Sequence, residues 1–445
     1  MKIAFVHQPW SRILPDKPSG STSIWTWHVS QRLQNQHDVY VYAQRHSGSL
    51  SYERKDKVQY VRVSAPLDRW IELAVRPLMK MRAADRPWMS SSLFHAQYYA
   101  RVAYDMKTKG IEVVHVHSFP QAAAIIRFFH PSVKIVVHLH VEWLNLMPPR
   151  VARRQIRDVD LVVNCSEYLS EKTRRALPAS SAKIKTIYNA VDMDVFRENQ
   201  SSPPSEAREW RILFVGRISP EKGIHILLEA FRRLIDDGDN VYLNIIGPDF
   251  LVPVEAIVGL SDSDIVSKLK VFYDTTPTAK LRSWLRGKYP RRLRWLQDTT
   301  YRGTLQRMVQ GKMASRVRFV GYVPNEDLPH WYRDADLVVL PSVYETFGIP
   351  LIEAMASGTP VLASRTGGIP EVIEDARTGL LVEPGNVDQL ARGIRRLLRD
   401  SALCRQMGQA GRKRVAEKFS WEKTAETLAR YYLDLVELPD ITHLR

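Results

Sequence analysis

Cysteine is scarce in this sequence. Only Cys165 and Cys404 occur among 445 residues, far apart and without the spacing of metal ligands. Small secreted domains held together by disulfides need many more cysteines, and cysteine-based zinc sites need them in close pairs. The sequence therefore excludes both classes and predicts two reduced, mostly buried thiols.

Long hydrophobic runs are absent as well. No apolar stretch approaches the roughly 18 residues that indicate a membrane-spanning helix. The apolar start at residues 3–6 is too short for the hydrophobic region of a signal peptide. We therefore expect a cytoplasmic protein in which residues 3–6 form the first buried strand.

Acidic residues are too few to balance the basic ones, and the formal net charge is +16. Residues 1–200 hold 29 Lys and Arg against 17 Asp and Glu, a net of +12, so most of the excess lies in the first half. This excess predicts attraction to anionic lipid headgroups on the inner face of a membrane, or to an acidic acceptor. The alternative is a basic surface that is simply solvated. No groove-reading motif accompanies the charge, so we expect no nucleic-acid partner.

A second basic region lies at residues 268–312, with 12 Lys and Arg against 2 Asp and Glu. Within it, leucine and tryptophan alternate with arginine from 281 to 296, as in a helix that lies in a membrane interface. The alternative is that these apolar side chains pack on their own domain. The surrounding segment, about 248–316, is longer than a crossover helix requires and predicts an insertion.

Short apolar runs alternate with helical patterns along both halves, which predicts an α/β protein with two doubly wound parallel sheets. In the first half the expected strands are 3–6, 39–42, 58–63, 113–116, 134–138 and 161–163. In the second half they are 211–215, 241–246, 317–320, 337–340, 360–363 and 380–382. The polar stretch 198–209 contains two prolines and no apolar run, so we expect a linker between domains 1–200 and 201–419. Ser420 is a plausible N-cap for a last helix within 420–445.

An aromatic-rich segment from 67 to 105 interrupts the first half and predicts helices. Trp70, Leu73 and Leu78 recur at helical spacing, which favours positions in the core.

Two carboxylates flank one predicted turn. The run 337–340 is short and wholly apolar, as in a strand buried on both faces. Pro350 suits the first position of the following helix, and Gly358 suits its end. Glu345 is then expected in the turn and Glu353 in the first turn of the helix. This is the carboxyl end of a parallel strand, where open α/β sheets bind ligands.

Two cations reach the same edge from another strand. The run GRISPEKG follows 211–215 and carries Arg217 and Lys222 to the start of a helix. A pyrophosphate needs charge neutralisation that Arg supplies as a fork and Lys as a point charge. Together with the carboxylates, which suit ribose or sugar hydroxyls, these cations predict a nucleotide-sugar pocket. The alternative is that both cations only form surface ion pairs.

These motifs resemble those of the retaining GT-B glycosyltransferases of the large family 4 type. The matches are G-R-x4-K-G at 216–223, E-x7-E at Glu345 and Glu353, and GG-x-PE at 367–371, in the family's order. Weaker matches lie at 136–140 and 187–192. The resemblance implies two Rossmann-like domains facing a central cleft, with the last helix packing back on the acceptor-side first domain. In the resembled family the segment 67–105 faces the acceptor, so the alternative to core positions is that a few of its residues contact the acceptor.

The resemblance also implies a function. A retaining glycosyltransferase moves a sugar from a nucleoside-diphosphate sugar, here a UDP- or GDP-sugar, to a lipid, saccharide or small-molecule acceptor. It needs no cofactor and no metal. A rival is a non-catalytic carbohydrate- or membrane-binding protein on the same scaffold.

Residue roles carried over from the family place Arg217 and Lys222 on the leaving diphosphate, with Glu345 and His140 beside the transferred sugar. These four are the expected catalytic residues. The expected donor-binding residues are Gly20, Gly216, Arg217, Lys222, Val323, Glu345, Phe347, Gly348, Ile349, Leu351 and Glu353. Glu353 is expected to bind ribose hydroxyls; the alternative is that it only interacts with the helix dipole.

Histidines repeat at two-residue spacing, at His115 and His117 and again at His138 and His140. His140 best matches the family histidine, although a two-residue slip would place His138 there. A pair at this spacing also suggests zinc, but a third ligand at close spacing is missing, so we expect no metal site. The usual glycine pair of the N-terminal loop is Ser19-Gly20 here, and Gly20 keeps the tight turn.

Overall fold

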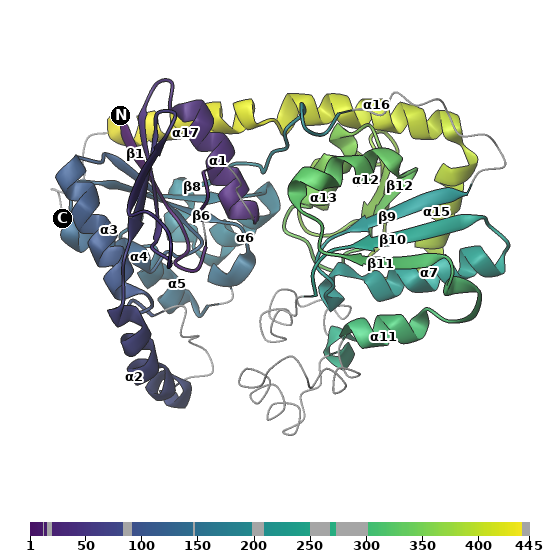
Figure 1. Cartoon of the computed structure of the whole chain (residues 1–445), viewed down its shortest axis with the longest axis horizontal. Coiled ribbons are helices and arrows are strands. Elements are labelled where there is room, and N and C mark those ends of the chain that lie inside the picture. Colours follow the sequence, from purple (N-terminus) through teal and green to yellow (C-terminus); the bar gives the residue numbers. More distant parts are fainter. Residues whose placement is uncertain are drawn as a thin grey trace. The chain divides into compact units, whose positions relative to one another are not determined.

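The computed structural model describes residues 1–11, 13–15, 20–82, 91–145, 147–197, 209–249, 268–272 and 301–437. The chain divides into two compact units (Figure 1). Unit 1 comprises Met1–Ala190 and Phe419–Arg445, and unit 2 comprises Val191–Lys418. The expected linker at 198–209 and the basic run 281–296 lie outside the described residues, apart from Glu209.

The sheet of unit 1 has the order β3-β4-β2-β1-β5-β6-β7-β8. All neighbouring strands pair in parallel except β3 with β4. The strands are β1 Lys2–Val6, β2 Asp38–Gln44, β3 Tyr52–Lys55, β4 Val58–Val63, β5 Val113–His117, β6 Lys134–Leu139, β7 Leu161–Asn164 and β8 Ile184–Thr186. The apolar runs predicted all of these except β3 and β8, which are short edge strands with charged residues.

Helices cover both faces of this sheet because successive side chains on each strand point to opposite faces. Ala4 and Val6 pack with α3, α4 and α5, whereas Ile3 and Phe5 pack with α1 and α17. The helices are α1 Ser21–Leu33, α2 Leu67–Arg82, α3 Ala96–Lys109, α4 Ala122–Phe129, α5 Pro149–Gln155, α6 Glu167–Ala176 and α17 Trp421–Glu437.

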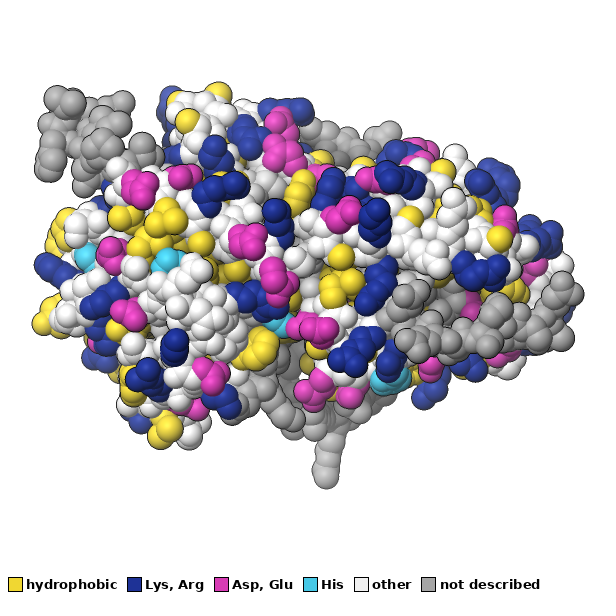
Figure 2. All heavy atoms as spheres, turned by 90° about the horizontal axis from the view of Figure 1, so that it is seen from above, with side chains coloured by type: hydrophobic (Ala, Val, Ile, Leu, Met, Phe, Trp, Pro, Cys, Tyr) yellow, Lys and Arg dark blue, Asp and Glu magenta, His cyan; other side chains and the backbone are white. Residues whose placement is uncertain are grey.

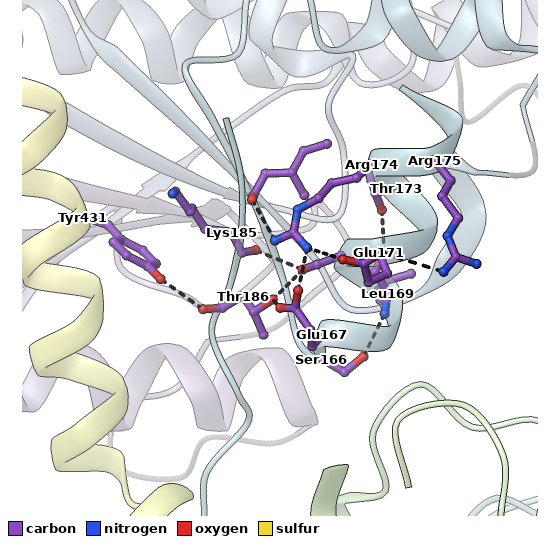
Figure 3. A network of polar contacts seen from close by, with 12 residues as sticks. Ser166, Glu167, Leu169, Glu171, Thr173, Arg174, Arg175, Lys185, Thr186 and Tyr431 are labelled. Carbon is purple, nitrogen blue, oxygen red and sulfur yellow. Dashed lines mark hydrogen bonds and ion pairs between the residues drawn. The ribbon is translucent and has the colours of Figure 1, made fainter. Parts of the chain in front are cut away.

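Helix α17 joins unit 1 from the far end of the chain. Its N-cap is Ser420, as the sequence predicts: the Ser420 hydroxyl accepts from the Lys423 amide at 3.3 Å. Trp421, Leu428 and Tyr432 are buried in the same core as α1. Figure 3 shows a further link, in which the Tyr431 hydroxyl donates to the Thr186 carbonyl of β8 at 3.4 Å. The last helix is therefore part of the core of unit 1.

Helix α2 differs from the expectation. Trp70 is 69% exposed and Leu73 is 60% exposed, so the prediction that they are core residues is wrong. The helix is held instead by buried Asp68, whose carboxylate accepts from the backbone amides of Gln97 and Tyr98 at the start of α3. A polar anchor of this kind leaves Trp70 and Leu73 in solvent.

Unit 2 contains one parallel sheet of order β11-β10-β9-β12-β13-β14. Its strands are β9 Trp210–Val215, β10 Val241–Ile246, β11 Val317–Gly321, β12 Leu337–Leu340, β13 Val361–Ser364 and β14 Leu380–Val382. The apolar pattern predicted each of them. The helices are α7 Ile224–Asp236, α11 Tyr301–Met308, α12 Leu328–Asp334, α13 Ile349–Ala356, α14 Ile369–Val372, α15 Val387–Arg399 and α16 Ser401–Lys418.

Two surface properties bear on partners. On the face shown in Figure 2, Lys and Arg side chains lie interspersed with Asp and Glu. Among the described residues, no helix is both long enough and apolar enough to cross a membrane.

Cys165 is buried and Cys404 is half-buried, and neither forms a disulfide.

Candidate functional site at the carboxyl edge of the second sheet

The loop after β9 closes tightly against the loop after β12. It passes through Gly216 and Arg217 into a single turn, Pro220–Lys222, and then through Gly223 into α7. Gly223 has a φ of 69°, and a Cβ there would lie 2.0 Å from the carbonyl oxygen of Pro341. A residue with a side chain cannot occupy this position without moving one of the loops.

Backbone hydrogen bonds fix the two loops together. The amides of Val343 and Tyr344 donate to the carbonyl of Glu221 at 2.8 and 3.3 Å. Because the first loop carries Lys222 and the second carries Glu345, these bonds set the distance between the two predicted site residues.

Lys222 and Glu345 form an ion pair. Lys222 Nζ lies 2.6 Å from Glu345 Oε2, and the two side chains are only 13% and 11% exposed. The other carboxylate oxygen of Glu345 accepts from the Thr346 amide at 3.2 Å. The structure thus brings together the cation assigned to the diphosphate and the carboxylate assigned to the sugar.

The Gly367-Gly368 loop packs on the backbone of Glu345. Gly367 has a φ of 55°, and a Cβ there would lie 1.7 Å from the Glu345 carbonyl oxygen. The Gly368 amide donates to the same oxygen at 3.2 Å. The second glycine motif therefore positions Glu345 from the side of β13.

Glu221 is a site residue that the sequence analysis missed. Its buried carboxylate accepts from the Ser219 hydroxyl at 2.6 Å and pairs with Arg217 Nη2 at 3.3 Å. Arg217 is itself 41% exposed. Glu221 therefore holds the guanidinium of Arg217 at the loop surface. Its spacing of four residues from Arg217 was the available signal, but a surface ion pair has the same spacing.

Glu353 occupies a different position from the one predicted. Helix α13 begins at Ile349, with Pro350 second, so Glu353 is the fifth residue and lies beyond the first turn. The start at Ile349 follows from Gly348, whose φ of 101° places it as the N-cap. The expectation that Glu353 lies in the first turn, where the helix dipole acts most strongly, is therefore wrong.

The carboxyl group of Glu353 is buried beside α12. Its Oε2 accepts from the Tyr332 hydroxyl at 2.7 Å, and Tyr332 is fully buried. Burial raises the pKa of Glu353 from 4.5 to about 7, although the Tyr332 hydrogen bond acts in the opposite direction. Glu353 consequently exchanges a proton near neutral pH.

The remaining predicted donor residues of unit 2 differ in exposure. Phe347 and Leu351 are buried in the core, which leaves only their backbone for ligand contact. Ile349 and Val323 are half-buried, and Val323 follows the end of β11. All these positions lie at the carboxyl ends of strands.

Gly20 and His140 belong to unit 1. Gly20 has a φ of 83° and is the N-cap of α1, as a tight turn requires; Ser19 lies outside the described residues. His140 follows β6 and is half-buried. Its Nε2 lies 3.0 Å from His117 Nδ1, and burial lowers its pKa to about 4. His140 is therefore neutral at pH 7.

A cavity of about 600 Å³ lies near these loops in unit 2. It is lined by Val343, by His225 and Ile226 at the start of α7, by residues 383–388 after β14, and by Lys268, Leu269 and Phe272 of the expected insertion. A second cavity, of about 300 Å³, is lined by Arg211, Tyr242 and Arg318 near the amino ends of their strands. Only the larger cavity lies at the sheet edge that carries the candidate site.

Known families and proteins match the chain along most of its length. Residues 22–195 match the family model described as Glycosyltransferase Family 4, and residues 195–414 match the model described as Glycosyl transferases group 1. The spore coat protein SA of Bacillus subtilis is 24% identical over 97% of this chain and 99% of its own length. The D-inositol 3-phosphate glycosyltransferase of Streptomyces avermitilis is 31% identical over 61% of this chain and 51% of that protein.

The fold is also similar to solved structures. Anabaena HepE, solved in complex with UDP and glucose, has a TM-score of 0.64 against this chain at 18% sequence identity. The match covers 98% of this chain and 100% of HepE.

Proposed function

This chain belongs to the group 1 and family 4 glycosyltransferases with the GT-B fold, and we propose that it transfers a sugar from a nucleoside-diphosphate sugar with retention of anomeric configuration. In this reaction the bond between the sugar C1 and the diphosphate oxygen breaks, and a bond between C1 and an acceptor hydroxyl oxygen forms on the same face. The acceptor proton moves to the leaving phosphate. No side chain then has to act as general base.

The observation that carries this proposal is the buried contact between Lys222 and Glu345. Charge develops on the leaving diphosphate in the transition state, and a cation held in a site with little water stabilises it strongly. Lys222 lies just before the N-terminus of α7 and can exchange its contact with Glu345 for a phosphate oxygen. Arg217, oriented by Glu221, supplies the second cation.

The two carboxylates have separate roles in this proposal. Glu345, fixed by Thr346 and by the Gly367-Gly368 loop, accepts from hydroxyls of the transferred sugar. Glu353, held by Tyr332, accepts from ribose hydroxyls of the nucleotide. Neutral His140 is a hydrogen-bonding group for the sugar, supplied by unit 1.

The proposed donor is a UDP- or GDP-sugar. The UDP and glucose bound to HepE, a protein of the same fold, support the first of these. The proposed acceptor is a lipid, a saccharide or a small molecule. The exposed Trp70 and Leu73 of α2 favour an acceptor with an apolar part. The reaction needs no cofactor, because the donor is a co-substrate and side-chain cations neutralise the diphosphate. We place the reaction in the cytoplasm.

Product analysis tests this proposal. The purified chain is incubated with a panel of UDP- and GDP-sugars and a lipid and metabolite extract, and new glycosides are identified by mass spectrometry. NMR coupling at the anomeric carbon then compares donor and product. We expect the same configuration in both, and equal turnover with and without added Mg²⁺. An inverted product would refute retention, and the absence of donor consumption would refute the donor assignment.

A further inference from the structure

Five histidines lie on one face of the sheet in unit 1. His115 and His117 are two residues apart on β5, so their side chains share a face. On β6, His138 pairs in register with His117, and His140 lies two residues farther along. His7 follows β1, whose Phe5 pairs with His115. Parallel pairing therefore places imidazoles side by side that the sequence separates.

The rings of His115, His117 and His138 surround a common point. Their centroids are 5.0, 5.2 and 5.7 Å apart. A ligand nitrogen of each lies within 4.8 Å of the other two. Nitrogens at 2.0–2.1 Å from a tetrahedral zinc ion require imidazole centroids about 5 Å apart. The ring spacing fits such an ion, and the rings must turn their nitrogens toward the common point when the ion binds.

Buried nitrogen atoms in this cluster lack hydrogen-bond partners. They are Nε2 of His115, both nitrogens of His138 and both nitrogens of His7. All three side chains are at most 1% exposed. An imidazole has one donor and one acceptor nitrogen, and burying both unpaired costs free energy. One metal ion would satisfy nitrogens of two adjacent strands at once.

We propose that His115, His117 and His138 bind one transition-metal ion of the kind that prefers imidazole ligands, such as Zn²⁺. The sequence analysis expected no metal because the two-residue repeat lacked a third ligand. Strand β6 supplies that ligand through its register with β5. The site lies in unit 1, and none of its three ligands is assigned a role in the proposed chemistry, although His117 contacts His140.

Existing hydrogen bonds already orient two of the three ligands. The Tyr432 hydroxyl lies 2.7 Å from His115 Nδ1, which leaves Nε2 of His115 for the metal. His117 contacts Thr26 Oγ1 through Nε2 at 2.9 Å and His140 through Nδ1, so one of these contacts gives way when His117 binds. A partner on the second nitrogen fixes ring orientation at metal sites. Water in a fourth position, ionised to hydroxide, would offset part of the charge.

Metal titration of the full chain tests the proposal. The protein is dialysed against chelator, the chelator is removed, and Co²⁺ is added as a spectroscopic probe. We expect one equivalent to bind with the visible absorption of a tetrahedral site, Zn²⁺ to displace it, and either ion to raise Tm. Binding of less than one equivalent, or no such absorption, would overturn the proposal in favour of water beside these nitrogens.

Variants locate the ion. His115→Gln and His138→Gln should each weaken Co²⁺ binding more than tenfold. His330→Gln, which removes an exposed histidine of unit 2, is the matched control and should leave binding unchanged. Far-ultraviolet circular dichroism and the Tm of the metal-free proteins show that each variant is folded. If either cluster variant is folded and binds Co²⁺ as tightly as the parent, the ion lies elsewhere and the assignment is wrong.

Discussion

Lys222 and Glu345 are 123 positions apart in the chain, and their charged groups are 2.6 Å apart in unit 2. Both side chains are largely shielded from water. A diphosphate that binds Lys222 must therefore weaken its contact with Glu345. In the proposed reaction the carboxylate would then become available to sugar hydroxyls when the donor binds, which would couple the two halves of donor recognition.

Replacing Lys222 tests this coupling. We expect Lys222→Ala to lower kcat by about 100-fold or more, because a cation on the leaving group acts mainly in the transition state. The fold should remain intact. Steady-state kinetics measures the effect, with exposed Lys312→Ala as the control that removes a lysine elsewhere in unit 2. A near-normal kcat in Lys222→Ala would remove the diphosphate assignment.

The glycine at 367 should be required for positioning and not only for its backbone angle. Gly367 and Gly311 have nearly the same φ, 55° and 59°, but a Cβ meets the Glu345 carbonyl only at 367. Alanine in this conformation costs roughly 1–2 kcal/mol at either position. We expect both variants to lose that stability and Gly367→Ala to lose more, because its Cβ also meets the Glu345 carbonyl; urea unfolding measures both losses. Only Gly367→Ala should also lose kcat, at least tenfold, and equal activity in both variants would contradict the role of this loop.

Donor binding should depend on the protonation of Glu353. Its pKa is about 7, so the ionised form that accepts from ribose hydroxyls is depleted as the pH falls below 7. We expect the donor Kd to rise by up to tenfold per pH unit below 7, measured by calorimetry. Glu353→Gln should bind donor weakly at every pH. A wild-type Kd that is flat from pH 5.5 to 8 would show that Glu353 does not contact the donor.

The same residue should lower stability at high pH. The unfolded carboxyl ionises near 4.5 and the folded one near 7, so its contribution to stability is lost as the pH rises between these values. Glu353→Gln removes this loss and should raise the free energy of unfolding at pH 8 by on the order of 1–3 kcal/mol. At pH 4 the wild type and Glu353→Gln should have equal free energies of unfolding.

Unit 1 should be sensitive to acid in the metal-free protein. Burial lowers the pKa of His7 to about 3 and that of His140 to about 4, so the unfolded state takes up protons from pH 6.5 downward while the folded state does not. Each such histidine lowers the free energy of unfolding by about 1.4 kcal/mol for every pH unit by which the pH falls below 6.5. We expect His7→Gln to reduce the fall in urea stability between pH 6.5 and 5 by about 2 kcal/mol. Phe128→Ser, which replaces an exposed non-titrating residue of the same unit, is the control and should leave that fall unchanged.

The exposed side chains of α2 provide a test of acceptor binding. Trp70→Ser and Leu73→Ser should lower kcat/KM for an acceptor with an apolar part by about tenfold, which corresponds to about 1.4 kcal/mol. Because both side chains are exposed, Tm should change little. Phe128→Ser is the matched control, since Phe128 is 77% exposed on α4 of the same unit. Equal kinetics in all three variants would remove α2 from the acceptor site.

The sequence predicted the fold class because buried parallel strands leave apolar runs that can be read directly. Edge strands such as β3, with the sequence YERK, carry no such signal because one side of each remains in solvent. The sequence also could not predict that Trp70 is exposed. Helical spacing identifies an apolar stripe but does not show whether another element covers it. Here the carboxylate of Asp68, and not the apolar stripe, attaches α2 to α3.

The contacts between site residues depend on how distant loops and strands meet, which the spacing of residues in the sequence does not show. The motifs placed Lys222 and Glu345 at one sheet edge, but their ion pair depends on the closure of two loops around Gly223 and the Pro341 carbonyl. Glu353 was expected one position too early in its helix, because the N-cap is Gly348 and the helix begins at Ile349 instead of Pro350. The three-histidine cluster depends on the register of β5 with β6, which a pattern within either strand cannot reveal.

The position of α17 sets an order for folding during synthesis. Trp421, Leu428 and Tyr432 belong to the core formed with α1 and the first strands, yet they are translated after all of unit 2. At about 5–20 residues per second, the ribosome needs on the order of 10–50 s to add the intervening unit. During that interval unit 1 exposes the apolar surface that α17 will cover. Unit 2, which needs no later residues, can fold first on the ribosome, and a nascent chain stalled before Trp421 would present that uncovered face to chaperones.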